Sequence, residues 1–470
     1  MSAELQEDTI AAIATGKGAA GIGIVKLSGR NALSIAAKLF RPGRNGCQES
    51  GTLFSGQSHR LYHGWIRSAP GGEILDEVLV GVMRGPHSFT GEDVVEINSH
   101  GGGQCLSAIL EAVLDGGARL AQPGEFTRRA WIHGRIDLTQ AEAVAELIHA
   151  RSAKALQFAR KRLQGGMGKR LKEVRQKAGQ LLAELEAGIE FGEEIDCRQD
   201  GKAVARILRS ELIATLKQAL CGYRQQRGYV EGVRVALVGA PNVGKSSLVN
   251  RLVCSERVLV SDFPGTTRDR VDVPMRLGDL PLVLCDTAGI DGSQALLDIA
   301  SRRISIDCLI ASDMVLFVLD AQRGADAEAE EIRRLLGQRP VILVFNKMDL
   351  VNGADDIQAP TDWPQWPVVK VSALRDANLG GLEAAIQQMA VGDAAGVDCD
   401  IVPNLRQYRL MQETLTALER GALALEESEG GESLAVCDLK EAMSCLDAAL
   451  GRRIDGDVLD AIFAQFCIGK

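Results

Sequence analysis

The sequence predicts a multidomain fold with an α+β N-terminal domain, an α-helical bundle domain and an α/β domain inserted into that bundle. Three observations predict it. The chain has 470 residues, which corresponds to about three domains of ordinary size. Short β-branched runs separated by glycine-rich breaks fill its first part. Farther on, near-continuous apolar runs alternate with helical segments, between two stretches rich in Ala, Leu, Glu, Lys and Arg.

Composition and charge narrow the class of protein. Apolar residues make up 46% and charged residues 24%, which excludes a disordered or collagen-like chain. The formal net charge of −9 excludes a protein that coats nucleic acid through bulk charge, but it is compatible with a local basic patch. The eleven cysteines include no CxxC pair, so we expect them to be reduced. We find no signal-peptide pattern and no apolar run of membrane-span length, and we therefore expect a cytoplasmic protein without a membrane segment.

Residues 1–136 are expected to form the α+β domain. The runs 22–27, 77–83 and 94–97 are apolar and β-branched, so each predicts a strand. Residues 106–114 carry apolar side chains at helical spacing and precede a pair of glycines, which predicts a helix with a glycine stop.

The helical bundle is expected to be built from two separate parts of the chain, residues 137–231 and 393–470. Both parts carry apolar residues at three- and four-residue spacing. Residues 232–392 lie between them and contain the runs VRVALVG, PLVLCD, MVLFVLD, VILVFN and VVKVS. Strands without polar alternation predict a parallel sheet that is covered by helices on both faces.

The first strand of the inserted domain leads into a phosphate-binding motif. Residues 239–246 read GAPNVGKS and match GxxxxGK[ST] between a strand and a helix. The glycines let backbone N–H groups surround a β-phosphate, and the helix N-terminus adds the positive end of its dipole. Lys245 would neutralise the β- and γ-phosphate oxygens, while the Ser246 hydroxyl would bind Mg²⁺.

Further motifs, each after a strand, indicate that the nucleotide is GTP. Thr267 would give Mg²⁺ a second hydroxyl ligand, and Asp286 would act on Mg²⁺ from its outer shell. Asp349 of the NKMD motif can accept hydrogen bonds from guanine N1–H and N2–H, a donor pair that adenine lacks. The domain therefore resembles the Ras-like P-loop G domains. The residues expected to contact GTP are Asn242, Val243, Gly244, Lys245, Ser246, Ser247, Ser261, Asp262, Phe263, Pro264, Gly265, Thr266, Thr267, Asp286, Thr287, Ala288, Gly289, Asn346, Lys347, Met348, Asp349, Ser372, Ala373 and Leu374.

The hydrolytic machinery departs from the Ras pattern. The position directly after the DTAG motif is Ile290, which cannot orient water as a Gln does. Another group must therefore position the water, and another charge must replace an arginine finger. Asn242 is a candidate ligand for a monovalent cation beside the β- and γ-phosphates, where a cation would stabilise the charge of the transition state.

Segments outside the inserted domain carry a resemblance to one family. They are the opening DTIAAIAT and GIGIVKLSG, the internal SFTGEDVVE and PGEFTRRA, and the closing FCIGK. Together with the G domain they make essentially the whole chain resemble the tRNA modification GTPases of the MnmE (TrmE) family, in the TrmE/Era-like superfamily. The resemblance implies a homodimer that acts with the flavoprotein MnmG, in a heterotetramer or larger complex, on the wobble uridine (U34) of certain tRNAs.

The resemblance also implies cofactors and their ligands. The product would be a 5-carboxymethylaminomethyl or aminomethyl uridine, with the one-carbon unit taken from 5-formyltetrahydrofolate or a related tetrahydrofolate. The N-terminal domain would mediate dimerisation and bind the folate together with the C-terminus. The implied folate contacts are Lys26, Glu96, Arg135 and Lys470, and the implied K⁺ ligands are Asn242, Ser261, Phe263 and Thr266. Potassium that orders the switch loop would favour pairing of two G domains.

The catalytic residue implied by the resemblance is Asp298. It stands where the family has a water-orienting Glu and is one methylene shorter, so we expect hydrolysis through a bridging water, with a slow rate as a possible outcome. A solvated helix carboxylate is an equally good interpretation.

Several alternatives stay open at this point. Residues 151–177 hold ten Lys and Arg against the single acid Glu173, which suits either a tRNA phosphate surface or a solvated helix face. Cys467 stands near Lys470, so it either serves the one-carbon chemistry or is a buried thiol at a helix end. The function itself has two alternatives: a ribosome-assembly GTPase, and a scaffold GTPase that binds GTP but barely hydrolyses it.

Overall fold

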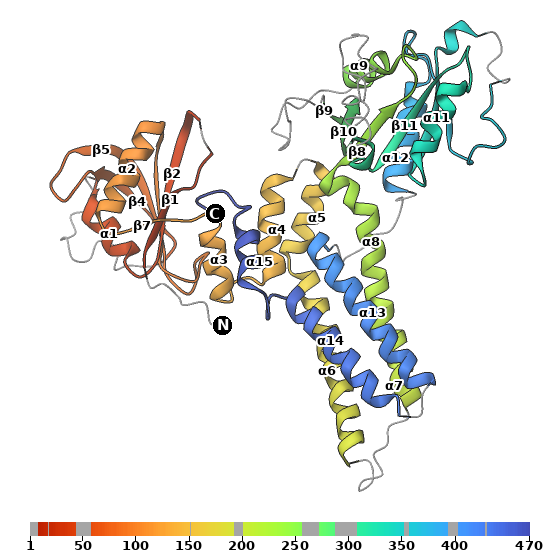
Figure 1. The fold of residues 1–470 in the computed structure, drawn as a ribbon. Helices are drawn as coiled ribbons and strands as arrows, with labels where there is room; N and C mark the ends of the chain where they lie inside the picture. Colours follow the sequence, from red (N-terminus) through yellow and green to blue (C-terminus); the bar gives the residue numbers. More distant parts are fainter. Residues whose placement is uncertain are drawn as a thin grey trace. The chain divides into compact units, whose positions relative to one another are not determined.

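The computed structural model describes residues 8–16, 18–43, 58–150, 152–191, 201–255, 272–286, 308–351, 357–392, 403–427 and 430–470. The chain divides into two compact units, whose elements are labelled in Figure 1. One unit contains residues 1–148, 162–212 and 413–470, and the other contains residues 149–161 and 213–412.

The first unit begins with a seven-stranded sheet in the order β3-β4-β5-β6-β2-β1-β7. Neighbouring strands are antiparallel except β1 and β7, which are parallel. The predicted strands and helix of this domain are confirmed as β2, β5, β6 and α2, each somewhat longer than expected. The strands are β1 (Ile10–Ile13), β2 (Ala20–Ser28), β3 (Phe40–Pro42), β4 (Arg60–Arg67), β5 (Ile74–Met83), β6 (Val94–Gly101) and β7 (Arg119–Leu120).

Two helices, α1 (Ala32–Leu39) and α2 (Gly103–Asp115), cover one face of this sheet (Figure 1). The core between them contains Val25, Val80 and Ile97 from the strands and Ile109 from α2, all of them buried. Part of the opposite face is covered by α3 (Glu125–Ile132), whose Phe126 is fully buried against Ile10 and Ala12 of β1.

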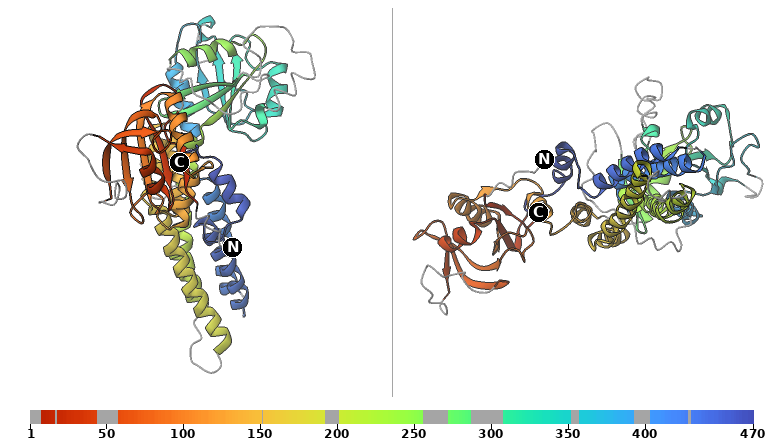
Figure 2. Two further views of the ribbon diagram at one scale, coloured as in Figure 1. Left: turned by 90° about the vertical axis from the view of Figure 1, so that its left-hand side faces the viewer. Right: turned by 90° about the horizontal axis from the view of Figure 1, so that it is seen from below.

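The helical part of the first unit is built from segments far apart in the sequence. Its longest helix, α6 (Gly166–Phe191), runs beside α14 (Glu432–Ala449), as the views in Figures 1 and 2 both show. Arg175 of α6 donates hydrogen bonds of 2.5 and 2.9 Å to the Asp447 carboxylate of α14, which stabilises the packing of the two helices. The remaining helices of the sequence stretches 137–231 and 393–470 are divided between the two units. They are α4 (Leu138–His149), α5 (Ala153–Leu163), α7 (Gly201–Ile207), α8 (Ala214–Glu231), α13 (Leu405–Glu427) and α15 (Gly456–Phe463), with a π-helix at Leu208–Ile213 between α7 and α8.

The C-terminal segment returns to the N-terminal sheet. Phe463 of α15 packs beside Gly124, at the start of α3, where a Cβ atom would lie 2.6 Å from the Phe463 carbonyl oxygen. Gly469 adopts φ +96° against the end of β1, where a Cβ would come within 2.5 Å of the Ile13 carbonyl oxygen. Only glycine fits this conformation and this gap without a shift, so the tail is held against the sheet.

The second unit contains a six-stranded sheet in the order β13-β12-β11-β8-β10-β9. The five strands predicted from apolar runs are parallel to one another, which confirms that prediction. The edge strand β9 is antiparallel to β10 and was not predicted, because its sequence DVPMRL mixes polar residues with a proline. The strands are β8 (Val233–Val238), β9 (Asp272–Leu277), β10 (Leu280–Asp286), β11 (Met314–Asp320), β12 (Val341–Asn346) and β13 (Val368–Lys370).

Apolar side chains fill both faces of this sheet. Leu237, Leu316 and Val344 point into one buried cluster, whereas Phe317 and Phe345 point into another on the opposite face. Helices α9 (Lys245–Ser255), α11 (Ala327–Leu336) and α12 (Leu379–Val391) belong to the same domain. The predicted fold class, with its α+β, helical and inserted α/β parts, is confirmed. None of the helices within the described residues is both long and apolar enough to span a lipid bilayer.

Candidate functional site

The loop between β8 and α9 has the backbone of a phosphate-binding loop. Gly239 adopts φ +157° and Gly244 φ +93°. A Cβ on Gly239 would lie 2.2 Å from the Val318 carbonyl oxygen, and one on Gly244 would lie 2.4 Å from the Asn346 amide nitrogen. These close contacts require glycine at both positions. They also show that the loop packs directly against β11 and β12.

The Lys245 ammonium group lies inside this loop. Its Nζ donates hydrogen bonds of 2.8 Å to the Gly239 carbonyl and 2.9 Å to the Ala240 carbonyl, and the residue is 6% exposed. A buried cation surrounded by backbone is poised to exchange these carbonyl partners for phosphate oxygens, which carry full negative charge.

Asn346, the last residue of β12, joins two loops that are far apart in sequence. Its Nδ2 donates to the Val243 carbonyl of the phosphate-binding loop at 2.9 Å, and its Oδ1 accepts from the Ala373 N–H at 3.1 Å. The residue is 2% exposed, so both amide atoms are satisfied inside the protein. The phosphate-binding loop and the loop after β13 are thus held in one arrangement by a single side chain.

The residues expected to bind the guanine base gather at the same sheet edge. Asp349 follows β12, and its Oδ1 accepts a 2.5 Å hydrogen bond from the Ser372 hydroxyl. Ser372 also pairs with Ala377 through two backbone hydrogen bonds of 3.1 Å, which closes the loop. Arg251 of α9 supports the loop from outside by donating to the Ala373 carbonyl at 3.2 Å. A carboxylate fixed in this way can present its acceptors to a purine edge.

A second group of charged side chains lies on the N-terminal sheet. Lys26 of β2 and Glu96 of β6 are opposite each other, with 3.7 Å between Nζ and Oε1. The Lys26 Nζ lies 4.7 Å from the centre of the Phe89 ring and 5.3 Å from that of Phe126. Burial lowers the pKa of the Lys26 ammonium, Glu96 opposes this shift, and the positive charge of Lys470 adds to it. The C-terminal residue therefore lies within electrostatic range of this ion pair.

Cys467 and Arg135, the two other residues expected at this site, are both exposed. Cys467 is exposed, so the alternative of a buried thiol is wrong, and its carbonyl accepts a 3.3 Å hydrogen bond from the Lys470 N–H. Arg135 is also exposed and lies beside Gly91. Within the described part of the chain, no hydrogen bond or ion pair joins the Arg135 guanidinium to Lys26 or Glu96.

Comparison with known proteins decides the family. Residues 138–467 match the model of the MnmE helical domain, and residues 9–135 match that of the GTP-binding protein TrmE N-terminus. The tRNA modification GTPase MnmE of Moorella thermoacetica is 40% identical over 471 residues, which cover 99% of this chain and 100% of that protein. The chain belongs to the MnmE family. MnmE of Syntrophobacter fumaroxidans is 41% identical, with 98% of each chain covered.

The family assignment confirms the resemblance and the enzyme class predicted from the sequence, because the MnmE family consists of tRNA modification GTPases. Among solved structures, an Era variant of Aquifex aeolicus bound to GDP·AlF4⁻ is 27% identical. It covers 39% of this chain and 66% of its own, with a TM-score of 0.27. That partial overlap adds nothing to the assignment.

Part of the predicted MnmE site lies outside the described residues. This part holds the switch-loop and DTAG residues that were expected to touch GTP, Mg²⁺ or K⁺, together with the catalytic candidate. They are Ser261, Asp262, Phe263, Pro264, Gly265, Thr266, Thr267, Thr287, Ala288, Gly289 and Asp298. Asp286 ends β10 and pairs with Leu237 through its backbone. Ser246 and Ser247 lie in the first turn of α9. In the described ranges, no group of three or more His, Cys, Asp or Glu could hold a metal ion.

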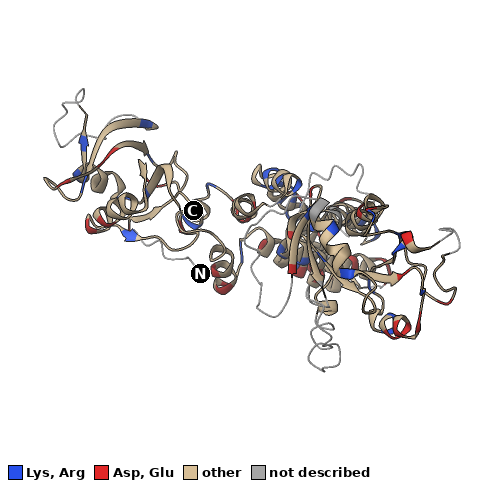
Figure 3. Ribbon diagram, turned by 90° about the horizontal axis from the view of Figure 1, so that it is seen from above, with Lys and Arg blue, Asp and Glu red and all other residues tan. Residues whose placement is uncertain are grey.

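Five of the ten basic residues in the stretch 151–177 of the MnmE-family helical region form ion pairs within the protein. Arg162 is buried against Glu146, and Arg170 pairs with Glu173 at 3.2 Å. Arg175 binds Asp447, as described above. Lys172 lies 3.2 Å from Asp137, and Lys177 lies 3.3 Å from Glu211. Over the described chain as a whole, Lys and Arg positions are interspersed with Asp and Glu positions (Figure 3). These pairs favour the structural interpretation of residues 151–177 over a free phosphate-binding surface.

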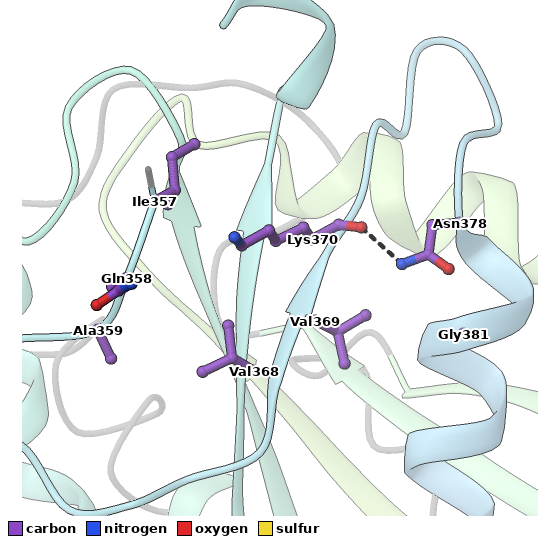
Figure 4. Close-up of a pocket in the computed structure, with 8 residues that line it drawn as sticks. All are labelled: Ile357, Gln358, Ala359, Val368, Val369, Lys370, Asn378 and Gly381. Atoms are coloured by element: carbon purple, nitrogen blue, oxygen red, sulfur yellow. Dashed lines mark hydrogen bonds between the residues drawn. The ribbon is translucent and has the colours of Figure 1, made fainter. Parts of the chain in front are cut away.

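An open groove of about 550 Å³ lies beside the base-binding loop. It is bordered by the free edge of β13, and Figure 4 shows the Asn378 side chain donating to the Lys370 carbonyl there, at 2.8 Å. The sequence analysis missed this groove, and it also missed Asp320, whose carboxylate lies 2.8 Å from the Lys347 ammonium. The signal for Asp320 was its place at the end of an apolar run, which it shares with Asn346 and Asp286.

Proposed function

We propose that this chain binds and hydrolyses GTP in order to drive the modification of wobble uridine in certain tRNAs. With MnmG, in a heterotetramer or larger complex, it forms the 5-carboxymethylaminomethyl or aminomethyl group at U34 in the cytoplasm. The observation that carries the GTP-binding part is the double hydrogen bond of Asn346, which locks the phosphate-binding loop and the base-binding loop together.

Guanine selection is assigned to Asp349. Its carboxylate accepts from guanine N1–H and N2–H, while the Ser372 hydroxyl keeps the carboxylate in place. Adenine has no matching donor pair, so the half-buried carboxylate would lose those two hydrogen bonds against it. Lys245 and the first turn of α9 bind the phosphates, and Mg²⁺ is held by the hydroxyls of Ser246 and Thr267.

The tetrahydrofolate is assigned to the N-terminal sheet, with Lys26, Glu96, Arg135 and Lys470 as its contacts. The fit rests on the chemistry of the group. A carboxylate such as Glu96 can hold the N–H edge of a pterin, and cations can hold a glutamate tail. The half-buried ring of Phe89 beside Lys26 supplies a flat apolar surface. When bound, the folate supplies the one-carbon unit, and Cys467 is the exposed thiol nearest to Lys470 in sequence.

Potassium and a homodimer complete the proposal. Asn242 adopts φ +64° and is exposed at the mouth of the phosphate-binding loop, where it would bind K⁺ together with Ser261, Phe263 and Thr266. Dimerisation of the N-terminal domain is supported by its open sheet face. Ile22, Leu61 and Leu79 are 65%, 68% and 44% exposed on the face opposite α1 and α2, which is unusual for three apolar strand residues.

Hydrolysis is assigned to Asp298, through a bridging water. Phosphate release should depend on K⁺ if the cation stabilises the transition state. Equal, near-zero rates in potassium and sodium buffers would instead support the scaffold GTPase.

The deciding experiment is wobble-nucleoside analysis of tRNA from cells that lack this protein. We expect the U34 modification to disappear, to return with the wild-type chain, and to stay absent with Lys245→Ala. The control is Lys38→Ala, because Lys38 is an exposed residue of α1 outside the proposed sites. Unchanged nucleosides would overturn the proposal and leave the ribosome-assembly GTPase.

A further inference from the structure

Asp320 is a buried carboxylate at the nucleotide end of the G-domain sheet. It ends β11 directly beside Asn346 of β12, and its side chain is 9% exposed. Its Oδ1 accepts from the Gln322 N–H at 2.9 Å, and its Oδ2 lies 2.8 Å from the Lys347 Nζ. Burial raises the pKa of this carboxyl, but the hydrogen bonds from Lys347 and Gln322 outweigh burial, so its pKa lies below the ordinary value. The carboxylate is therefore charged at neutral pH.

Lys347 continues the chain of contacts toward the phosphate-binding loop. The same Nζ that meets Asp320 donates a 2.6 Å hydrogen bond to the Asn242 carbonyl. Lys347 and Asn242 both adopt φ +64°, a left-handed conformation that is strained for a non-glycine residue. Such conformations persist only where surrounding contacts hold them, and the ammonium group joins the two strained residues directly.

We infer that Asp320 is a positioning residue of the guanine-nucleotide site, acting through Lys347 on the backbone of Asn242. The carboxylate holds the ammonium group over the loop, and the ammonium group holds the peptide that precedes Val243 and Gly244. Without the carboxylate, the flexible lysine side chain can swing into solvent and leave the Asn242 carbonyl without this donor. The loop would then be less well ordered for phosphate before nucleotide arrives, and binding would have to supply that order.

This inference rests on the proposed binding of guanine nucleotide, and it concerns affinity rather than the chemical step. The test is the Asp320→Asn variant of the full chain, which keeps the shape and removes the charge. We expect release of a fluorescent GDP analogue to become about tenfold faster, in line with a lost charge-assisted hydrogen bond. The KM for GTP should rise by a similar factor, while kcat at saturating GTP stays within about twofold.

A double-mutant cycle separates positioning from a general structural role. In a Lys347→Met background, Asp320→Asn should change GDP release by less than about twofold, because the ammonium group through which Asp320 acts is gone. Asp279→Asn, in the exposed hairpin between β9 and β10, is the matched control and should leave release unchanged. The inference is overturned if Asp320→Asn releases GDP at the wild-type rate, or if it accelerates release equally in both backgrounds. A wild-type chain that binds no guanine nucleotide would overturn the proposed function itself.

Discussion

The amide nitrogen of Asn346 lies 2.9 Å from the carbonyl oxygen of Val243, so the residue that ends β12 fixes the loop that follows β8. Because the same side chain also accepts from Ala373, its loss would free both loops together.

The Asn346→Ala variant should bind GDP about 30-fold more weakly. Two buried hydrogen bonds are lost, each contributing about 1 kcal/mol, and their partners stay buried. Equilibrium titration with GDP measures the effect. Gln358→Ala, at the groove beside β13, serves as control, and a dissociation constant for Asn346→Ala within about twofold of wild type would contradict the assigned role.

Gly244→Ala should abolish tight nucleotide binding. Its Cβ would lie 2.4 Å from the Asn346 amide nitrogen, in addition to the cost of φ +93°. Gly392→Ala isolates the backbone cost, because Gly392 has φ +69° but nothing within 4 Å of its Cβ position. We expect Gly392→Ala to lower the free energy of unfolding by about 1–3 kcal/mol without changing GDP affinity. Equal GDP affinities for the two variants would show that the close contact with Asn346 is unimportant.

Asp349→Asn should exchange guanine for xanthine as the preferred base. The amide nitrogen of Asn can donate to the C2 carbonyl of xanthine. In guanine the same position carries the N2–H donor, and two donors that face each other form no hydrogen bond. We expect GDP affinity to fall by at least about 100-fold and xanthosine diphosphate affinity to rise, as measured by competition. An unchanged preference would place base recognition elsewhere.

Lys26→Met should weaken binding of a tetrahydrofolate by tenfold or more, if the N-terminal sheet holds it through charge-assisted hydrogen bonds. Binding is followed by fluorescence titration with the full chain. Lys38→Met removes an exposed charge from α1 in the same domain and should have no effect. Equal folate affinity for both variants would remove Lys26 from the proposed site.

The acid stability of the N-terminal domain should depend on Glu125. Burial raises the pKa of this carboxyl, but hydrogen bonds from Arg119, the Gln122 backbone and Arg129 outweigh burial and place the pKa below its usual value of 4.5. Since the folded pKa is depressed, the stabilisation is present above about pH 4.5 and is lost as pH falls through the folded value.

The Glu125→Gln variant should therefore be less stable than wild type at pH 7, by about 3 kcal/mol, because two arginines lose a buried partner. The difference should be smaller at pH 3, which lies below the usual pKa of 4.5, because the carboxyl of the unfolded wild-type chain is then protonated. Urea unfolding followed by hydrogen exchange of peptides covering residues 119–132 measures both values. A difference that does not depend on pH would show that the charge of Glu125 is not what stabilises the domain.

The sequence predicted those parts of the fold that local patterns encode. The parallel strands β8, β10, β11, β12 and β13 are uninterrupted apolar runs, and the phosphate-binding motif requires glycine at positions where the structure has close backbone contacts. The strands β1, β3, β4, β7 and β9 were not predicted, because they are short or carry polar residues and gain their stability from pairing.

Ion pairs between residues far apart in the sequence could not be predicted either. The basic stretch at residues 151–177 could not be interpreted from sequence, since the partner of Arg175 is Asp447 on another helix. Asp320 was missed because it reads only as the polar end of an apolar run, and its partner Lys347 was assigned to the nucleotide alone. A pattern along the chain identifies a side chain, whereas its partner depends on which elements the fold brings together.

The contact of Gly469 with Ile13 brings together two segments from opposite ends of the sequence. During translation the sheet that contains Ile13 leaves the ribosome first, yet the segment that lies against it is made only after the helical and nucleotide-binding regions. The Lys26 neighbourhood is thus completed late in synthesis. A chain cut short before residue 466 would carry its G-domain motifs intact, but the surroundings of Lys26 in the N-terminal domain would be incomplete.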